Sequence, residues 1–477
     1  MRGRQDQLSW GKSLSVIDRP QLALLATLLI AAALLGGSSR YDVMQNALMQ
    51  PIAWVVAGFA LVFAGAVRTW PKELRWPLAM LLTLLVLAAA QLVPLSESLW
   101  SGLPGREPLA DIAAAINSDA ARPMSMVPSR TLNALAALGI PLAALLVMAG
   151  MGQRGVYPLL ASIVALALLS ALLGILQITT GYSDAGYFYR ITSEGAPVGI
   201  FANRNHTAVF GSLALLVIAF LVTRQERRAF PGADVLLWSA YGAIFLTILV
   251  NGSRAGLLTT GIAMAATALL VIGSRDAAQL AKPGRKGGAR SVIVRYLPAA
   301  VIIVFAAIIV AIFLLADRLA AFQRIVAQNP LEDLRFRVVP QLIEMIETYF
   351  PLGTGLGAFE RTYRIHEASD LLGPNYLNMA HNDWLQWLIE TGLPGLILLL
   401  AFLIWLGFHL LRLRRVGRGH LVLGIAGFAI FAVASYFDYP LRTPLFQVAG
   451  VWFFCALALL GNAAARGTTR DQAIAAG

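Results

Sequence analysis

One histidine and a few arginines, far apart in the chain, are the residues whose types could do chemistry together. His381 carries an imidazole whose ordinary pKa, near about 6.5, lets it accept a proton at neutral pH. Arg204, Arg254 and Arg337 lie in polar segments between apolar runs, and guanidinium groups match the oxygens of phosphate groups. A base beside such arginines could deprotonate an attacking hydroxyl while a diphosphate group leaves. These residue types therefore predict a metal-free displacement on a lipid-diphosphate-linked donor.

Each of these residues also has a plainer explanation, which the sequence leaves open. Arg254 could be a snorkelling arginine at a helix end, because long basic side chains reach toward water there. Asn205, next to Arg204, could serve only to cap the helix that follows. A single histidine in a loop, such as His381, is most often an ordinary surface residue.

The sequence predicts neither a metal site nor a nucleotide cofactor. It contains no Asp-x-Asp, no His-Glu-x-x-His and no pair of cysteines, which are familiar arrangements of metal ligands. Gly353, Gly355 and Gly357 do not form a dinucleotide fingerprint, because no strand–turn–helix pattern surrounds them. Cys455 is the only cysteine, so the chain cannot form an internal disulfide.

The elements that must position these side chains are transmembrane helices. The chain is 58% hydrophobic and 13% charged over 477 residues, whereas a soluble domain has about 25% charged residues. A spanning helix needs about 20 apolar residues. Twelve segments meet this requirement: 20–38, 51–67, 77–94, 131–149, 156–178, 207–223, 234–250, 255–273, 297–315, 394–411, 421–437 and 446–462. The predicted fold is an all-α, polytopic bundle of about twelve transmembrane helices.

The distribution of Lys and Arg predicts how the bundle is oriented. Every short loop on one side is basic, which is typical of cytoplasmic loops, so both termini are expected in the cytoplasm. The net charge of +12 is explained by these loops, and we expect no nucleic-acid partner. The predicted parts are 1–315, with nine spans and an outer loop at 95–130; 316–393, a long outer loop; and 394–477, with three spans and a cytoplasmic tail.

The long outer loop 316–393 should be a folded helical cap. Apolar residues recur at helical spacing between Val338 and Phe350, with polar residues on the opposite face. The Gly-rich stretch Pro351–Gly357 should end this helix in a tight turn. Later in the loop, a short amphipathic helix should begin at His381 and lead into the span at 394–411.

Four stretches of this sequence resemble the O-antigen ligase-like membrane proteins. This family includes O-antigen ligases, some O-antigen polymerases and bacterial O-linked oligosaccharyltransferases. Its His motif, His-[Asn/Ser/Gln] followed by nine residues and Gly-x-x-Gly, matches His381-Asn382 and Gly392-Leu393-Pro394-Gly395. The other similar stretches are Phe201–Asn205, Ser253–Gly256, and the segment from Arg337 to Phe359.

The resemblance implies an activity and a set of site residues. The activity is inverting, metal-independent glycan transfer from undecaprenyl diphosphate to an acceptor hydroxyl, at the periplasmic face of the bacterial inner membrane. His381 would be the base or would orient the acceptor, and arginines would bind the diphosphate. The expected substrate-binding residues are Arg254, Arg337, Arg335, Arg204 and Asn382, where the spacing lets either Arg335 or Arg337 face the site. The expected supporting residues are Asn205, Gly355, Gly357, Glu390, Gly392 and Gly395.

The identity of the acceptor stays open at this point. Ligation to lipid A-core is favoured, because the ligase form of the His motif is complete. Polymerisation of O-antigen or exopolysaccharide repeat units is the alternative within the family, and transfer to protein has no supporting feature. The alternative from another class is a transporter or a flippase for lipid-linked glycans. Transporters commonly show internal repeats, and none is visible here.

Overall fold

The computed structural model confirms the all-α, polytopic membrane fold. It describes residues 17–65, 70–181, 186–223, 232–274, 337–372 and 377–475. Within these ranges the only strands are β1 (Pro94–Leu95) and β2 (Arg122–Pro123), which form one antiparallel pair. Nine helices in the described residues are long and apolar enough to cross a membrane.

The predicted spans correspond closely to these helices. The long apolar helices are α3 (Met44–Gly65), α4 (Arg75–Ala90), α7 (Pro128–Ala137) continuing into α8 (Gly139–Thr179), α9 (Arg204–Val222), α10 (Ala233–Asn251), α11 (Arg254–Ile272), α18 (Asp383–Val416), α19 (Arg418–Phe437) and α20 (Pro444–Ala475). The spans predicted at 131–149 and 156–178 both lie in the α7–α8 segment, which bends at Gly152. The first span is the shorter helix α2 (Arg19–Leu35), and the span predicted at 297–315 lies outside the described residues.

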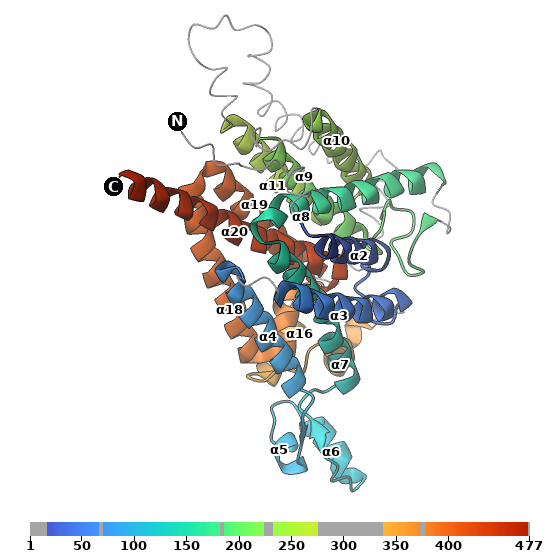
Figure 1. Cartoon of the computed structure of the whole chain (residues 1–477). Helices are drawn as coiled ribbons and strands as arrows, with labels where there is room; N and C mark the ends of the chain where they lie inside the picture. The colour runs from blue at the N-terminus through green and yellow to red at the C-terminus, as the bar shows by residue number, and fades with distance from the viewer. Residues whose placement is uncertain are drawn as a thin grey trace, which may run out of the picture.

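Helix α9 lies at the centre of the bundle. It packs against α8, α10, α11 and α19 (Figure 1). Nearly all of its side chains are buried. Peripheral helices instead expose large apolar side chains, such as Leu246 on α10 and Ile404 on α18. Because apolar side chains on a spanning helix can face lipid, this pattern fits a bundle that surrounds one central helix. The beginning of α9 is therefore a fixed point in the structure.

Part of the predicted outer cap is described, and it has its own small core. Helices α16 (Val339–Tyr349) and α17 (Phe359–His366) pack against the first half of α18 through a cluster that includes Leu342, Met345, Phe359 and Ile389. The amphipathic helix predicted at 338–350 is thus confirmed. Its buried face is narrower than expected, because Ile343 and Phe350 are exposed.

The segment predicted as an outer loop at 95–130 contains two short helices. They are α5 (Glu97–Ser101) and α6 (Glu107–Ala115), which project from one end of the molecule beyond α4 and α7 (Figure 1). Arg106, between them, is buried and donates through Nη2 to the carbonyls of Met124 (2.8 Å) and Gly353 (3.3 Å). This segment is therefore attached to the Gly-rich turn that follows α16.

Helix α18 is broken at Gly392, where φ is 56°. The break leaves backbone groups that the Gly-rich turn satisfies: the amides of Thr354 and Gly355 donate to the carbonyls of Ile389 (2.9 Å) and Glu390 (3.0 Å). In the other direction, the amide of Leu393 donates to the carbonyl of Pro351 at 2.7 Å. The first glycine of the family motif, Gly392, is thus the kink itself, and it separates the short helix 383–391 from the spanning helix, as the sequence predicted.

The kink predicts that Gly392→Ala destabilises the protein by on the order of 2 kcal/mol or more. A left-handed backbone is unfavourable for residues with a Cβ, and a Cβ at Gly392 would overlap the carbonyl oxygen of Pro351. Thermal unfolding of the purified protein in detergent measures the effect. Gly407→Ala is the matched control, because Gly407 lies on the same helix and a Cβ there meets nothing within 4 Å. Equal melting temperatures for the two variants would contradict this account of the kink.

Candidate active site

A buried carboxylate, Asp438, lies where three helices meet. It follows α19 directly, and only 1% of its surface is exposed. Its Oδ2 accepts hydrogen bonds from the side-chain amides of Asn205 (2.7 Å) and Asn203 (3.3 Å), and its Oδ1 accepts from the amide of Tyr439 (3.1 Å). Its Oδ1 also lies 3.2 Å from Nδ1 of His381. One carboxylate therefore joins the start of α9, the end of α19 and His381, which lies two residues before the start of α18.

His381 is held in a fixed orientation beside this carboxylate. Its backbone is in the left-handed region, with φ of 49°, and its side chain is 9% exposed. The imidazole lies edge-on to the ring of Tyr439, with 4.7 Å between ring centroids. Non-glycine residues rarely adopt this backbone conformation, and such residues occur often at functional sites. Because an ionised carboxylate only accepts hydrogen bonds, Nδ1 of His381 donates to Asp438, which leaves Nε2 as the acceptor.

Polar residues at the helix starts complete this arrangement. Asn203 caps α9 by accepting from the amide of Asn205 (2.8 Å), and Ser253 caps α11 by accepting from the amide of Gly256 (2.9 Å). Ser253 Oγ also donates to Oδ1 of Asn205 at 2.8 Å, which connects the two helix starts. The cap of α9 is thus Asn203, and the idea that Asn205 caps this helix was wrong. Asn205 is free to bind Asp438 because its neighbour two residues earlier performs the capping.

The predicted arginines differ in where the structure places them. Arg204 and Arg254 are the first residues of α9 and α11, so both lie at the end of the bundle where His381 is. Arg254 is exposed and Arg204 is half-buried. Arg337 is exposed in the cap, two residues before α16, and Arg335 lies outside the described residues.

Asn382 and the supporting residues of the family motif make structural contacts. Asn382, predicted to bind substrate, caps α18 through a hydrogen bond from the amide of Leu385 (3.1 Å). Glu390 is fully buried and accepts from Arg442 and from Gln386. Gly355 has a positive φ, and a Cβ there would overlap Ser125. The remaining glycines behave similarly: Gly357 also has a positive φ, and a Cβ at Gly395 would overlap the hydroxyl of Thr391.

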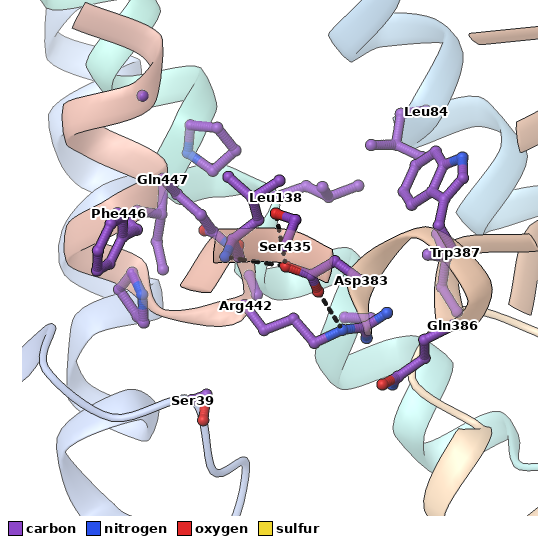
Figure 2. Close-up of a pocket in the computed structure, with 18 of the residues that line it drawn as sticks. Ser39, Leu84, Leu138, Asp383, Gln386, Trp387, Ser435, Arg442, Phe446 and Gln447 are labelled. Carbon is purple, nitrogen blue, oxygen red and sulfur yellow. Dashed lines mark hydrogen bonds and ion pairs between the residues drawn. The ribbon is translucent and has the colours of Figure 1, made fainter. Parts of the chain in front are cut away.

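A pocket of about 540 Å³ lies beside this network. Its polar end contains Asp383 and Arg442, which face each other in Figure 2, with Ser435 and Gln386 next to them. Its body is mainly apolar, with apolar side chains from α4, α8, α18, α19 and α20, and Leu399 is among the lining residues. His381, Arg204 and Arg254 do not line the pocket. The His381–Asp438 pair is therefore outside the pocket lining, although Asp383, which lines the pocket, is two residues from His381.

Sequence reasoning missed Asp438 and Arg442. A signal for both was present, because Asp438 is the only acidic residue and Arg442 the only lysine or arginine between positions 421 and 462. An isolated charge beside an apolar span is costly unless it has a function or a partner. Gln91 was also missed: it accepts from the amide of Leu356 and donates to the carbonyl of Glu390, which attaches the end of α4 to the kink. No sequence pattern distinguishes Gln91 from other glutamines.

Within the described part of the chain, no group of three or more His, Cys, Asp or Glu side chains is arranged to hold a metal ion. The arrangement present is instead a histidine oriented by a carboxylate, with arginines at the adjacent helix starts. Such an arrangement can accept a proton from a hydroxyl and can bind an anion nearby.

The fold and the site together define a polytopic membrane protein with one buried His–Asp pair at one end of its bundle. Comparison with protein families adds that residues 239–400 match the family described as O-antigen ligase, which supports an O-antigen ligase-like family for this part of the chain. The match supports glycan transfer of the ligase or polymerase type on lipid-linked substrates in a membrane. It includes Arg254 and the whole His motif, whereas Asn205, Asp438 and Arg442 lie outside it. A search of curated proteins finds no matching relative.

The hydrogen bond between Asn205 and Asp438 predicts strong coupling between these residues. In a double-mutant cycle with Asn205→Ala and Asp438→Ala, the free energies of unfolding should depart from additivity by about 2 kcal/mol, because a hydrogen bond to a charged group is lost. Thermal or denaturant unfolding of the purified variants measures this coupling. The control cycle pairs Asn205→Ala with Asp111→Ala on the projecting helix α6. Additive effects in both cycles would show that Asp438 does not hold α9.

Proposed function

We propose that this protein transfers a glycan from an undecaprenyl diphosphate-linked donor to an acceptor hydroxyl, most simply as an O-antigen ligase acting on lipid A-core. The observation that carries this proposal is His381, held by Asp438 at the junction of α9, α18 and α19. A histidine oriented in this way can act as a general base, and the family match points to glycan transfer.

The reaction follows from the roles of a few side chains. The acceptor hydroxyl gives its proton to Nε2 of His381 as its oxygen bonds to the anomeric carbon of the donor sugar. The bond from that carbon to the diphosphate breaks, and the diphosphate leaves with the electron pair. A single displacement of this kind inverts the anomeric configuration. Asp438 stabilises the imidazolium that forms.

Arg204 and Arg254 are suited to hold the leaving diphosphate. Each begins a helix of 19 residues, and the N-terminus of a helix favours anions through its unpaired amides and its dipole. The hydrogen bond from Ser253 to Asn205 keeps these two helix starts together. With the leaving group neutralised by arginines, the displacement needs no metal ion. Arg337, in the cap, would approach the same anion from above the bundle.

The proposed orientation places His381 at the periplasmic face of the inner membrane. Helix α18 extends for 34 residues from Asp383 to Val416, so its two ends lie on opposite sides of a membrane. Arg412, Arg414 and Arg415 lie at the far end, and Arg418 begins α19. Four arginines at one connection are typical of the cytoplasmic side. Both termini would then be cytoplasmic, and 316–393 would be the periplasmic loop.

The apolar pocket offers a place for the hydrocarbon chain of the donor lipid. Leucine and phenylalanine are the most frequent residues in its lining, and most of them come from helices that span the membrane. An apolar cavity at this depth is filled more favourably by a lipid chain than by water. The chain would lie along α18 and α20, and the diphosphate would reach the helix starts beside His381.

Loss of the base should abolish transfer. His381→Ala should lower activity by at least about 10²-fold, because general base catalysis by a positioned side chain contributes 10²–10⁴-fold. Cells that carry only the variant would be examined by polysaccharide gel. Lipid-linked chains without their core anchor identify a ligase, whereas core with a single repeat identifies a polymerase. His366→Ala is the control, because His366 lies on α17 against Tyr349, and a variant of His381 with full activity would exclude the proposed role.

Filling the pocket should weaken donor binding without altering the His–Asp pair. Leu399→Trp places a bulky side chain in the pocket, and we expect the KM for the lipid-linked donor to rise at least several-fold. Leu400→Trp is the control: it is the same substitution one residue along α18, at a position that is 49% exposed and does not line the pocket. Transfer assays with purified protein in lipid nanodiscs measure both. Similar KM values for the two variants would exclude the pocket as the donor's lipid site.

A further inference from the structure

One guanidinium group connects the segment that carries His381 with the segment that carries Asp438. Arg442 is the last residue of the short helix η5 (Pro440–Arg442), which links α19 to α20. Its Nε donates to Oδ1 of Asp383 at 3.3 Å, and its Nη1 donates to both carboxylate oxygens of Glu390 at 3.1 and 3.3 Å. These contacts are largely closed to solvent, since the side chain of Glu390 is fully buried and that of Asp383 is 9% exposed.

The three residues in this contact lie close in sequence to His381, to the kink at Gly392 and to Asp438. Asp383 follows His381 by two residues, and Glu390 precedes the kink at Gly392 by two residues. Arg442 follows Asp438 by four residues, within the same short connection. The two contacts of Arg442 therefore fix both ends of the helical segment 383–391 against the connection that bears Asp438.

The chemistry of this contact requires an arginine. Burial alone would lower the pKa of Arg442, but the carboxylates of Glu390 and Asp383 raise it above its ordinary value, so the group stays charged. A guanidinium presents several N–H groups in a rigid plane and can reach two carboxylates at once, whereas a lysine ammonium is a single point charge on a flexible stem. Asp383 also accepts from Ser435 Oγ and the amide of Leu441, both at 3.3 Å, which brings α19 into the same contact.

We propose that Arg442 is a positioning residue: by binding Asp383 and Glu390 together, it sets the distance and angle between His381 and Asp438 and so the readiness of His381 to accept a proton. Arg442 itself does not touch the reacting atoms. This inference rests on the proposed role of His381 as the base. It adds a residue that lies outside the part of the chain matched by the family.

A contact that is only structural would have different consequences. Another arginine, Arg40, makes a similar two-bond contact with Asp42, at 3.0 and 2.8 Å, in the connection between α2 and α3. Its side chain is 18% exposed, compared with 19% for Arg442. The partner Asp42 is more exposed, at 37%. Arg40 is therefore a control for replacing an arginine fork by lysine, and the hydrogen bonds described do not join its side chain to the segments of His381 and Asp438.

The test uses Arg442→Lys and Arg40→Lys in the full-length protein in nanodiscs. For Arg442→Lys we expect kcat to fall at least tenfold, because the alignment of His381 is lost; the KM for donor can change as well, because Arg442 also lines the polar end of the pocket. Arg40→Lys should leave both constants near those of the wild type. A kcat unchanged in Arg442→Lys, or a change in KM alone, would overturn the proposal.

A second measurement does not depend on activity. Carbethoxylation of each histidine by diethyl pyrocarbonate, quantified by mass spectrometry of peptides, reports the reactivity of His381 against that of His366 on α17. In Arg442→Lys the rate at His381 should change at least threefold while the reference rate at His366 stays constant. Equal changes at both histidines would indicate general loosening and overturn the proposal. If the rate at His381 shifts as expected but the wild type transfers no glycan, the positioning role stands and the proposed function fails.

A third variant guards against misfolding. Arg442→Lys leaves two buried carboxylates with fewer hydrogen bonds, so the neutral combination Arg442→Met with Asp383→Asn and Glu390→Gln removes all three charges. This combination should fold with a melting temperature near that of the wild type, since a buried ion network replaced by neutral groups is often tolerated. We expect its kcat to remain at least tenfold low and its carbethoxylation rate at His381 to stay shifted. Wild-type values for both would overturn the proposal.

Discussion

The site depends on the burial of one carboxylate. An ionised carboxylate removed from water is unfavourable by several kcal/mol unless hydrogen-bond donors surround it. Asp438 obtains these donors from Asn203 and Asn205 at the start of α9, from His381, and from the amide of Tyr439. The helices can satisfy Asp438 only by meeting at this point. The convergence of distant stretches of the chain is thus a consequence of one charge that must be solvated by the protein.

The surrounding structure keeps this junction from relaxing. The short helix 383–391 follows His381 and ends at the kink at Gly392. Amides of the Gly-rich turn donate hydrogen bonds to the carbonyls that the kink leaves without helical partners. Backbone strain at His381, with φ of 49°, is held in place by this packing and by the small core of the cap. A strained residue on a well-packed support is a common way to fix a reactive side chain. The site therefore lies at helix ends and kinks, where backbone groups are available, and the bundle supplies rigidity.

The sequence predicted the parts of this arrangement that depend on local pattern. Hydropathy found the spanning helices because their length and composition are set by the membrane, and helical periodicity found α16. The roles of Asp438 and Arg442 depend on partners from 52 to more than 200 residues away, so no local pattern contains them. The two asparagines around Arg204 show the same limit: each could cap α9, and only the folded backbone shows that Asn203 does so while Asn205 binds Asp438.

The most direct test of the central interaction is the tautomer of His381 in the folded protein. Histidine-selective ¹⁵N NMR of the wild type and of Asp438→Ala, with His381 assigned through His381→Gln, measures which ring nitrogen carries hydrogen. The account predicts that Nδ1 of His381 is protonated and hydrogen-bonded in the wild type, and that this signal is replaced by a mixture of tautomers when Asp438 is removed. Identical His381 signals in the two proteins would contradict it.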